Sequence, residues 1–234
     1  MIDVFAHRGL HVLERENTIA AFRAAVALGV DGVELDVRRT RDGVLVVHHD
    51  ANIGSLAIAH SVRSALPEYV PTLDQALESL VGVAVNVEIK NDRGTSDDYE
   101  ATAELVGLVL ATIDESSRSD RISISSFDLA TCTYARSMDR DLSVAWLWWD
   151  VAVADALVQA HLLGFNGVNP HFSTVDAEVV ARARELELDV NVWTVNLTED
   201  LERMSALGVA CIITDDPLLA REVVTRATPT GTTR

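Results

Sequence analysis

The chain has 234 residues, of which 48% are hydrophobic, and its formal net charge is −17. This length exceeds that of an ordinary single domain but suits an α/β barrel. The negative charge argues against nucleic acids and anionic membrane surfaces as partners, and no apolar run reaches the roughly 18 residues expected of a membrane-spanning helix.

Short β-rich runs alternate with amphipathic helical segments along the chain. The first strand is predicted at residues 2–6, which leaves no room for a signal peptide, so we expect a cytoplasmic protein. The other predicted strands are 32–37, 44–48, 83–89, 121–125, 142–147, 166–169, 189–194 and 210–214. The predicted helices are 17–28 (capped by Asn17 or Thr18), 73–81, 97–114, 128–138, 152–163, 175–187, 199–207 and 217–226. This alternation predicts a parallel sheet.

No linker interrupts the alternation, so we expect one catalytic domain over residues 1–226. Residues 227–234, ATPTGTTR, predict a flexible C-terminal tail. Cys132 and Cys211 are too few for a disulfide framework. We therefore expect both cysteines to be small buried residues.

Nine predicted strands are one more than an eight-stranded barrel uses. The runs 32–37 and 44–48 are too close together to be parallel, because a parallel crossover needs about a dozen residues. Asp42 and Gly43 predict a two-residue hairpin turn between them. The sequence therefore predicts an α/β protein with a (β/α)8 TIM barrel, a β-hairpin excursion after the second strand, and an active site at the C-terminal ends of the strands.

The predicted hairpin register gathers charged residues on one face. With a two-residue turn at residues 42–43, Asp36 lies opposite His49, and strand alternation adds Glu34 to the same face. His48 then points away. A one-residue bulge would exchange the two histidines.

Two other predicted strand ends carry polar residues. In the run NVEIK, alternation places Asn86, Glu88 and Lys90 on one face. Glu88 and Lys90 could form only a structural ion pair, and a lone histidine such as His7 is more often structural than catalytic. The coincidence of these groups with Glu34, Asp36 and His49 at neighbouring strand ends favours a functional site.

The chemistry of these groups is that of a cation and an anion bound together. Three carboxylates make a hard-oxygen site suited to Mg²⁺ or Ca²⁺ rather than Zn²⁺. Two histidines supply an acid and a base that titrate near neutral pH, and Arg8 and Lys90 supply positive charge. The charges of these groups, one divalent cation and one phosphodiester cancel, which favours burial of the complete site.

The chain resembles the glycerophosphodiester phosphodiesterase family. The resemblance is carried, in order, by AHRG, ENTIAAFRAAVALGVDGVELDVRRTRDGVLVVHHD, PTLDQAL, NVEIK, ISSF, GVNP, VWTVN and GVACIITDDP. It implies a (β/α)8 barrel and assigns roles to nine residues: a general acid/base pair in which either residue could be the acid, His7 and His49; the metal ligands, Glu34, Asp36 and Glu88; the phosphate contacts, Arg8 and Lys90; and pocket-lining residues, Phe127 and Trp193.

The expected activity is the metal-dependent hydrolysis of a small glycerophosphodiester to glycerol 3-phosphate and an alcohol, with Mg²⁺ or Ca²⁺ as the cofactor and Mn²⁺ as a third option. A phospholipase D-like activity on lysolipids and a non-catalytic phosphoester-binding barrel are the alternatives. The segment after Asp50 lacks the Pro-x-Leu-Asp-Arg-Thr-Thr-x-Gly pattern common in the family, which leaves the preferred alcohol open. In the run WLWWD, Trp146 is a core candidate, whereas Trp148 and Trp149 are candidates for an apolar rim. No oligomeric state is predicted.

Overall fold

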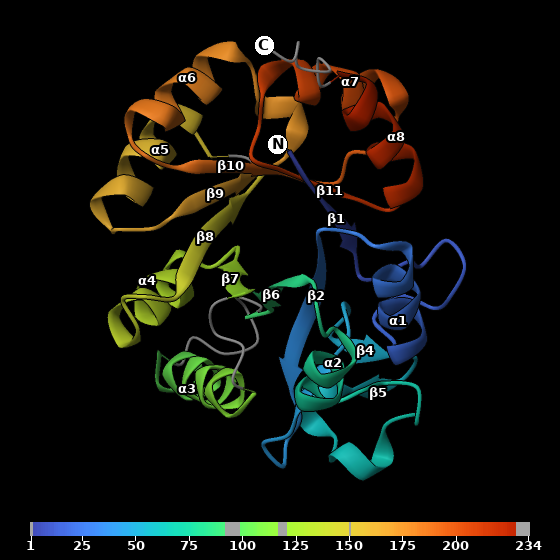
Figure 1. Cartoon of the computed structure of the whole chain (residues 1–234). Coiled ribbons are helices and arrows are strands. Elements are labelled where there is room, and N and C mark those ends of the chain that lie inside the picture. Colours follow the sequence, from blue (N-terminus) through green and yellow to red (C-terminus); the bar gives the residue numbers. More distant parts are fainter. Residues whose placement is uncertain (1, 92–98, 117–120, 150, 228–234) are drawn as a thin grey trace.

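A closed sheet of eight parallel strands, surrounded by helices, forms the centre of the molecule (Figure 1). The computed structural model describes residues 2–91, 99–116, 121–149 and 151–227. The barrel strands are β1 (Asp3–His7), β2 (Gly32–Arg39), β6 (Ala84–Ile89), β7 (Ile122–Ser126), β8 (Ser143–Trp148), β9 (Gly167–Pro170), β10 (Asp189–Val192) and β11 (Cys211–Thr214). Pairing of β1 with both β2 and β11 closes the barrel.

The helices follow the barrel strands as the sequence predicts. They are α1 (Ile19–Leu28), α2 (Leu73–Ser79), α3 (Tyr99–Glu115), α4 (Leu129–Met138), α5 (Val153–Leu162), α6 (Ala177–Glu185), α7 (Thr198–Leu207) and α8 (Pro217–Ala227). This confirms the (β/α)8 barrel. The hairpin after the second strand is also present. Residues 97–98 of the third predicted helix and 228–234 of the predicted tail lie outside the described residues.

Alternation along β2 separates the core from the site. Val33, Leu35 and Val37 are fully buried in the hydrophobic core, whereas Glu34 and Asp36 take the intervening positions. The first helix begins after Thr18, whose Oγ1 accepts the amide of Ala21 at 3.3 Å. Of the two predicted caps, Thr18 is therefore the one used, and Asn17 is free to act elsewhere.

The hairpin formed by β2 and β3 (Leu45–Val47) differs from the prediction by one residue. Arg39 pairs with Leu45, and Val37 pairs with Val47, so the register is not the one that a two-residue turn would give. The amide of Gly43 donates to the carbonyl of Thr40 at 3.0 Å, and Gly43 has a φ of 83°. A glycine in this left-handed conformation is typical of hairpin loops longer than two residues. The predicted pairing of Asp36 with His49 is therefore wrong.

A small extension follows the hairpin. It contains the short strands β4 (Asn52–Ile53) and β5 (Leu56–Ala57) and the 3₁₀ turns η1 (Ile58–His60) and η2 (Arg63–Ala65). Ile58 of η1 forms a second buried apolar cluster with Val46 of β3 and with Leu66 and Val70, which precede α2. A further 3₁₀ turn, η4 (Phe172–Thr174), follows β9.

Two other expectations concern burial and membranes. Cys132 and Cys211 are both buried free thiols, as predicted. Within the described ranges, every helix is too short or too polar to cross a bilayer. The cytoplasmic location stays a prediction.

Candidate active site

Strand register brings the acidic side chains together at the mouth of the barrel. His7 of β1 pairs with Glu34 of β2, and two residues further on Asp36 pairs with Glu88 of β6. Glu34, Asp36 and Glu88 are only 3%, 1% and 6% exposed, respectively. Their carboxylate oxygens lie within 4.8 Å of one another. The predicted cluster therefore exists as one buried triad of carboxylates.

Two cations contact this triad. Lys90 Nζ lies 3.1 Å from Asp36 Oδ1 and 2.5 Å from Glu88 Oε1. Arg8 Nε lies 3.3 Å from Asp36 Oδ2, and its terminal nitrogen bonds both carboxylate oxygens of Glu16 at 3.1 Å. Arg8 and Lys90 are thus placed beside the carboxylates, at the position where an anion would be attracted.

The electrostatics show that the triad is short of positive charge. Burial, followed by repulsion from Asp36 and Glu88, raises the pKa of Glu34 well above its usual value. Burial also raises the pKa of Glu88 to about 7, against the opposing effect of Lys90. Burial would raise the pKa of Asp36 too, but Lys90 and Arg8 outweigh it and hold that pKa below its ordinary value. A further cation would let all three carboxylates ionise.

The donor set fits a divalent cation. Glu34 Oε1 is buried and has no hydrogen-bond partner among the residues that the structure describes. An unpaired buried carboxylate oxygen is costly. Three carboxylates without sulfur or imidazole are the ligands of Mg²⁺ or Ca²⁺. Glu34, Asp36 and Glu88 are therefore suited to hold such a cation.

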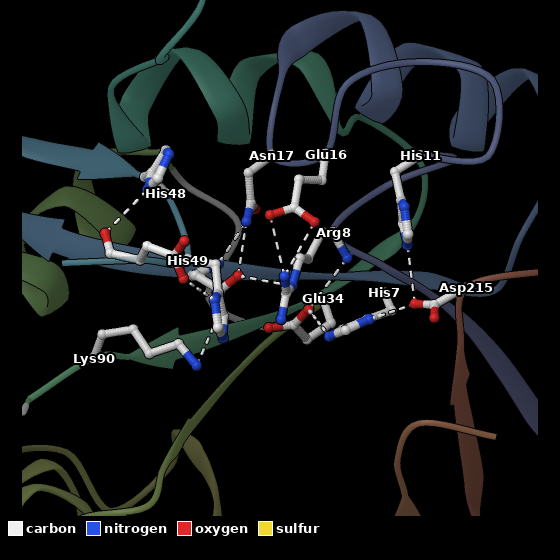
Figure 2. A network of polar contacts seen from close by, with 12 residues as sticks. His7, Arg8, His11, Glu16, Asn17, Glu34, His48, His49, Lys90 and Asp215 are labelled. Carbon is white, nitrogen blue, oxygen red and sulfur yellow. Dashed lines mark hydrogen bonds and ion pairs between the residues drawn. The ribbon is translucent and has the colours of Figure 1, made fainter. Parts of the chain in front are cut away.

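His49 faces the triad and His48 does not, although the predicted register is wrong (Figure 2). The ladder ends at Val47, after which His48 donates its backbone amide to the carbonyl of Asp36 at 2.9 Å. The guanidinium of Arg38 then binds the carbonyl of His49 at 2.6 and 2.9 Å and so turns the chain. The His49 ring lies at the cluster, where burial lowers its pKa.

His7 is held by a residue that we did not predict. Its Nδ1 lies 2.6 Å from Oδ1 of Asp215, just after β11, while its Nε2 lies 3.9 Å from Glu34 Oε2. Nε2 of His11 contacts the same Asp215 oxygen at 2.9 Å. Asp215 is in the family-like run GVACIITDDP, at the end of the last strand. Its position at the end of a barrel strand is the feature of the sequence that could have indicated Asp215 as a site residue.

Asn17 is a second residue that the sequence did not single out for the site. It is 2% exposed, has a φ of 54° and donates from Nδ2 to Asp36 Oδ2 at 2.7 Å. Arg8 also has a positive φ, 56°. Two non-glycine residues in the left-handed region, both against Asp36, indicate that backbone strain is accepted to orient this carboxylate.

Aromatic side chains occupy the other half of the barrel mouth. Phe127, Trp149, His171 and Trp193 follow β7, β8, β9 and β10 in turn. Phe127 meets Trp193 edge to face at 5.3 Å, and Trp149 stacks on His171 at 5.5 Å. Lys90 lies 5.7 Å from the Phe127 ring. Four strands thus supply an aromatic half beside the charged half from β1, β2, β6 and β11.

The three tryptophans at the end of β8 differ in how much of their surface is exposed to solvent. Trp146 is buried, as predicted. Trp148 is also buried, with 2% of its surface exposed, so its predicted place on an apolar rim is wrong. Residues two apart in a strand share a face, and the Trp148 ring accordingly meets that of Trp146 at 5.3 Å within the main core. Trp149 lies beyond the strand and is 64% exposed, which suits a rim.

A cavity of about 490 Å³ opens between the charged half and Phe127. Its volume suits a small organic phosphate. It is lined by Arg38, His49, Asp50, Ala51, Glu88, Ile89, Lys90, Asn91, Ser126, Phe127 and Asp128.

Comparison with known proteins identifies the family of this chain. Residues 7–219 match the sequence model of the glycerophosphoryl diester phosphodiesterase family. A glycerophosphodiester phosphodiesterase from Caldanaerobacter subterraneus is 31% identical over 236 residues, covering 92% of this chain and 94% of that protein. The chain belongs to the glycerophosphoryl diester phosphodiesterase family.

Solved structures show the same fold. A glycerophosphodiester phosphodiesterase from Parabacteroides distasonis has a TM-score of 0.88 at 26% identity, covering 97% of this chain and 98% of that chain. A phosphodiesterase from Oleispira antarctica, solved in complex with the product sn-glycerol-3-phosphate, has a TM-score of 0.87 at 21% identity, covering 96% and 97%. The predicted family membership and enzyme class are thus confirmed, while the roles of individual residues remain predictions.

Proposed function

We propose that this phosphodiesterase hydrolyses glycerophosphodiesters to glycerol 3-phosphate and an alcohol, using a divalent cation and the histidine pair His7 and His49. The supporting observation is that His7 and His49 lie on either side of Arg8 and Glu34 (Figure 2), and that Glu34 belongs to the buried carboxylate triad. Family membership supports the substrate class, and the product complex of the Oleispira relative supports the glycerol 3-phosphate product.

The side chains act as follows. Glu34, Asp36 and Glu88 would hold the cation, which supplies Lewis-acid polarisation of the phosphoryl oxygens. Arg8 and Lys90 attract the phosphate group and hold it against the triad. One histidine takes the proton of the attacking water, or of a glycerol hydroxyl whose cyclic phosphate product water then opens, and the other gives a proton to the departing alkoxide.

The direct test is a product assay on glycerophosphoethanolamine, glycerophosphocholine and a lysolipid, with and without Mg²⁺, Ca²⁺ or Mn²⁺. We expect glycerol 3-phosphate from the first two substrates and none of it in excess chelator. Faster turnover of the lysolipid would favour the phospholipase D-like alternative, which the exposed Phe127 and Trp149 make worth including. Tight phosphoester binding without turnover would favour the non-catalytic barrel.

We expect divalent cations to stabilise the protein more at pH 8 than at pH 5. Raised carboxyl pKa values, such as the value of about 7 for Glu88, mean that the folded state holds protons which the unfolded state has lost above about pH 4.5. Without a cation, these carboxyl groups therefore make the folded state less stable as the pH rises from about 4.5 to about 7. At pH 5 a cation must displace protons, whereas at pH 8 it meets charged carboxylates.

The measurement is the cation-induced change in Tm. At about 100 times the Kd, binding adds ~2.7 kcal/mol, which for a chain of this size is about 5–10 °C. We expect that shift at pH 8 and a smaller one at pH 5. The variant Glu88→Gln should lose most of it at both pH values. Equal shifts at pH 5 and pH 8 in the wild type would contradict the raised pKa values.

We expect Trp149→Ala to change which alcohol is preferred. An exposed ring beside the mouth can cover an apolar alcohol, and full burial of such a group contributes ~1.5–3 kcal/mol. The kcat/KM of the bulkier substrates should fall about tenfold relative to that of glycerophosphoethanolamine. Leu162→Ala, an exposed residue at the end of α5, is the control. If Trp149→Ala slows all substrates by one factor, the rim assignment is wrong.

A further inference from the structure

Asp215 lies at the centre of a hydrogen-bond network that the proposed reaction does not by itself explain. Its Oδ1 is 2.6 Å from His7 Nδ1 and 2.9 Å from His11 Nε2. Its Oδ2 accepts from Asn196 Nδ2 at 2.6 Å. Burial would raise the pKa of Asp215, but the hydrogen bonds from the two histidines outweigh it and hold that pKa below its ordinary value. This carboxylate is therefore ionised and acts only as an acceptor.

The direction of these bonds determines which nitrogen of His7 exchanges protons. An ionised carboxylate can bind an imidazole nitrogen at 2.6 Å only if that nitrogen carries the proton. Nδ1 of His7 is therefore protonated whether the ring is neutral or charged. Nε2 is left on the side of the carboxylate triad, 3.9 Å from Glu34 Oε2.

We propose that Asp215 is a positioning residue that keeps a proton on Nδ1 of His7, so that Nε2 is the nitrogen that gives or takes the proton in catalysis. The inference deepens the proposed function and rests on it for the catalytic role of His7. His11 shares the same oxygen and fixes the Asp215 carboxylate from the other side. Without this contact, the His7 ring could adopt the other tautomer, in which Nε2 already holds a proton and cannot accept one.

The neighbouring Asn196 has an amide orientation that makes a sharp test. Its Oδ1 accepts from the Asp215 amide at 2.9 Å and from the Thr214 hydroxyl at 3.1 Å, so its Nδ2 must face Asp215. In Asp215→Asn, the new amide would either set its NH₂ group against that of Asn196 or turn it toward His7. The second choice forces His7 into the Nε2–H tautomer.

Exchanging the two side chains should repair this defect. In the double variant Asn196→Asp/Asp215→Asn, the amide oxygen introduced at position 215 can accept from His7, while the accompanying NH₂ group donates to the carboxylate now at position 196. The hydrogen-bond pattern is restored, but the charge has moved away from His7. The double variant thus separates proton placement from charge.

The experiment combines ¹⁵N NMR of histidine-labelled protein with steady-state kinetics. The His7 signals are identified by their loss in His7→Gln and followed to the pH above which they no longer change, so that they report the neutral ring. We expect the Nδ1–H tautomer in the wild type, Nε2–H in Asp215→Asn, and Nδ1–H again in the double variant. We expect kcat to fall about 10²–10⁴-fold in Asp215→Asn with little change in KM, and about tenfold or greater recovery in the double variant.

Asp216→Asn is the matched control. The Asp216 side chain accepts from the Leu219 amide at 3.0 Å at the start of α8, and asparagine caps helices as well as aspartate does. The His7 tautomer should therefore stay unchanged in this variant.

Three outcomes would overturn the proposal. One is a wild-type His7 that carries its proton on Nε2. Another is a His7 Nδ1 signal that reports coordination when a divalent cation is added, which would place a metal ion between His7, His11 and Asp215. The third is an Asp215→Asn variant that keeps both the tautomer and kcat. The wild-type spectrum decides proton placement even if a variant fails to fold or if no glycerophosphodiester is hydrolysed, so failure of the proposed function is recognised separately.

Discussion

The variant His49→Ala is expected to lose about 10²–10⁴-fold in kcat/KM, the usual effect of removing a general acid or base. His49 faces Asp36 and Lys90 and lines the cavity. His48 is adjacent in sequence, but its Nδ1 contacts the carbonyl of Asp50 at 3.0 Å, away from the triad. The variant His48→Ala should therefore retain most activity.

The adjacent histidines make this comparison well controlled. Both variants remove an imidazole from the same turn, so a general loss of stability would affect them similarly, and Tm should be recorded for each. Equal losses of activity at equal Tm would mean that the turn held by Arg38 does not direct His49 into the site.

Replacement of one carboxylate of the triad should be nearly as damaging. We expect Glu88→Gln, which keeps the shape of the side chain, to lower kcat/KM by about 10²–10³-fold, because loss of the cation's charge stabilisation amounts to several kcal/mol. A chelator should abolish wild-type turnover, and Mg²⁺, Mn²⁺ or Ca²⁺ should restore it. Glu78→Gln, on the exposed surface of α2, is the control and should be as active as the wild type.

Titration of the same variants with the cation tests whether Glu88→Gln loses activity because it binds the cation more weakly or because it lacks the ion pair with Lys90. If Glu88 holds the cation, the metal concentration for half-maximal activity should rise in Glu88→Gln. Full wild-type activity in excess chelator would refute metal dependence altogether, and the ion pair with Lys90 would then account for the placement of Glu88.

The barrel could be predicted from the sequence because its signals are local. Alternating apolar residues in β2, capping at Thr18 and the spacing of strands and helices placed each predicted barrel strand and helix close to the observed one. The same alternation brought Glu34 and Asp36 together with Glu88, because parallel strands in register preserve the face on which a side chain lies.

The hairpin could not be read correctly from its turn residues alone. Asp42 and Gly43 suit a two-residue turn, but Thr40 bonds Val44 through both its backbone and its hydroxyl, which favours a longer loop. His49 reaches the site because the chain leaves the strand after Val47. The prediction that His49 rather than His48 faces the site therefore agrees with the structure. The cause is the end of the strand at Val47, which strand alternation alone does not predict.

Contacts between distant parts of the chain were the other missing information. Asp215 and His7 are 208 residues apart, and only closure of the barrel by β1 and β11 makes them neighbours. A strand-end aspartate could have been flagged, but its partner could not. Burial of Trp148 is a different case, because alternation with Trp146 already placed both rings on the same face.

The arrangement of the barrel mouth has a consequence for how this enzyme can evolve. The charged half comes from β6, β2, β1 and β11, and the aromatic half from β7 to β10, so each forms one continuous arc of the closed sheet. Mutations in separate arcs should combine additively when the residues are far apart, which allows recombination of one arc with the other from a relative. Epistasis is expected at the two seams, where Lys90 lies over Phe127 and where Asn196, after β10, donates to Asp215, after β11.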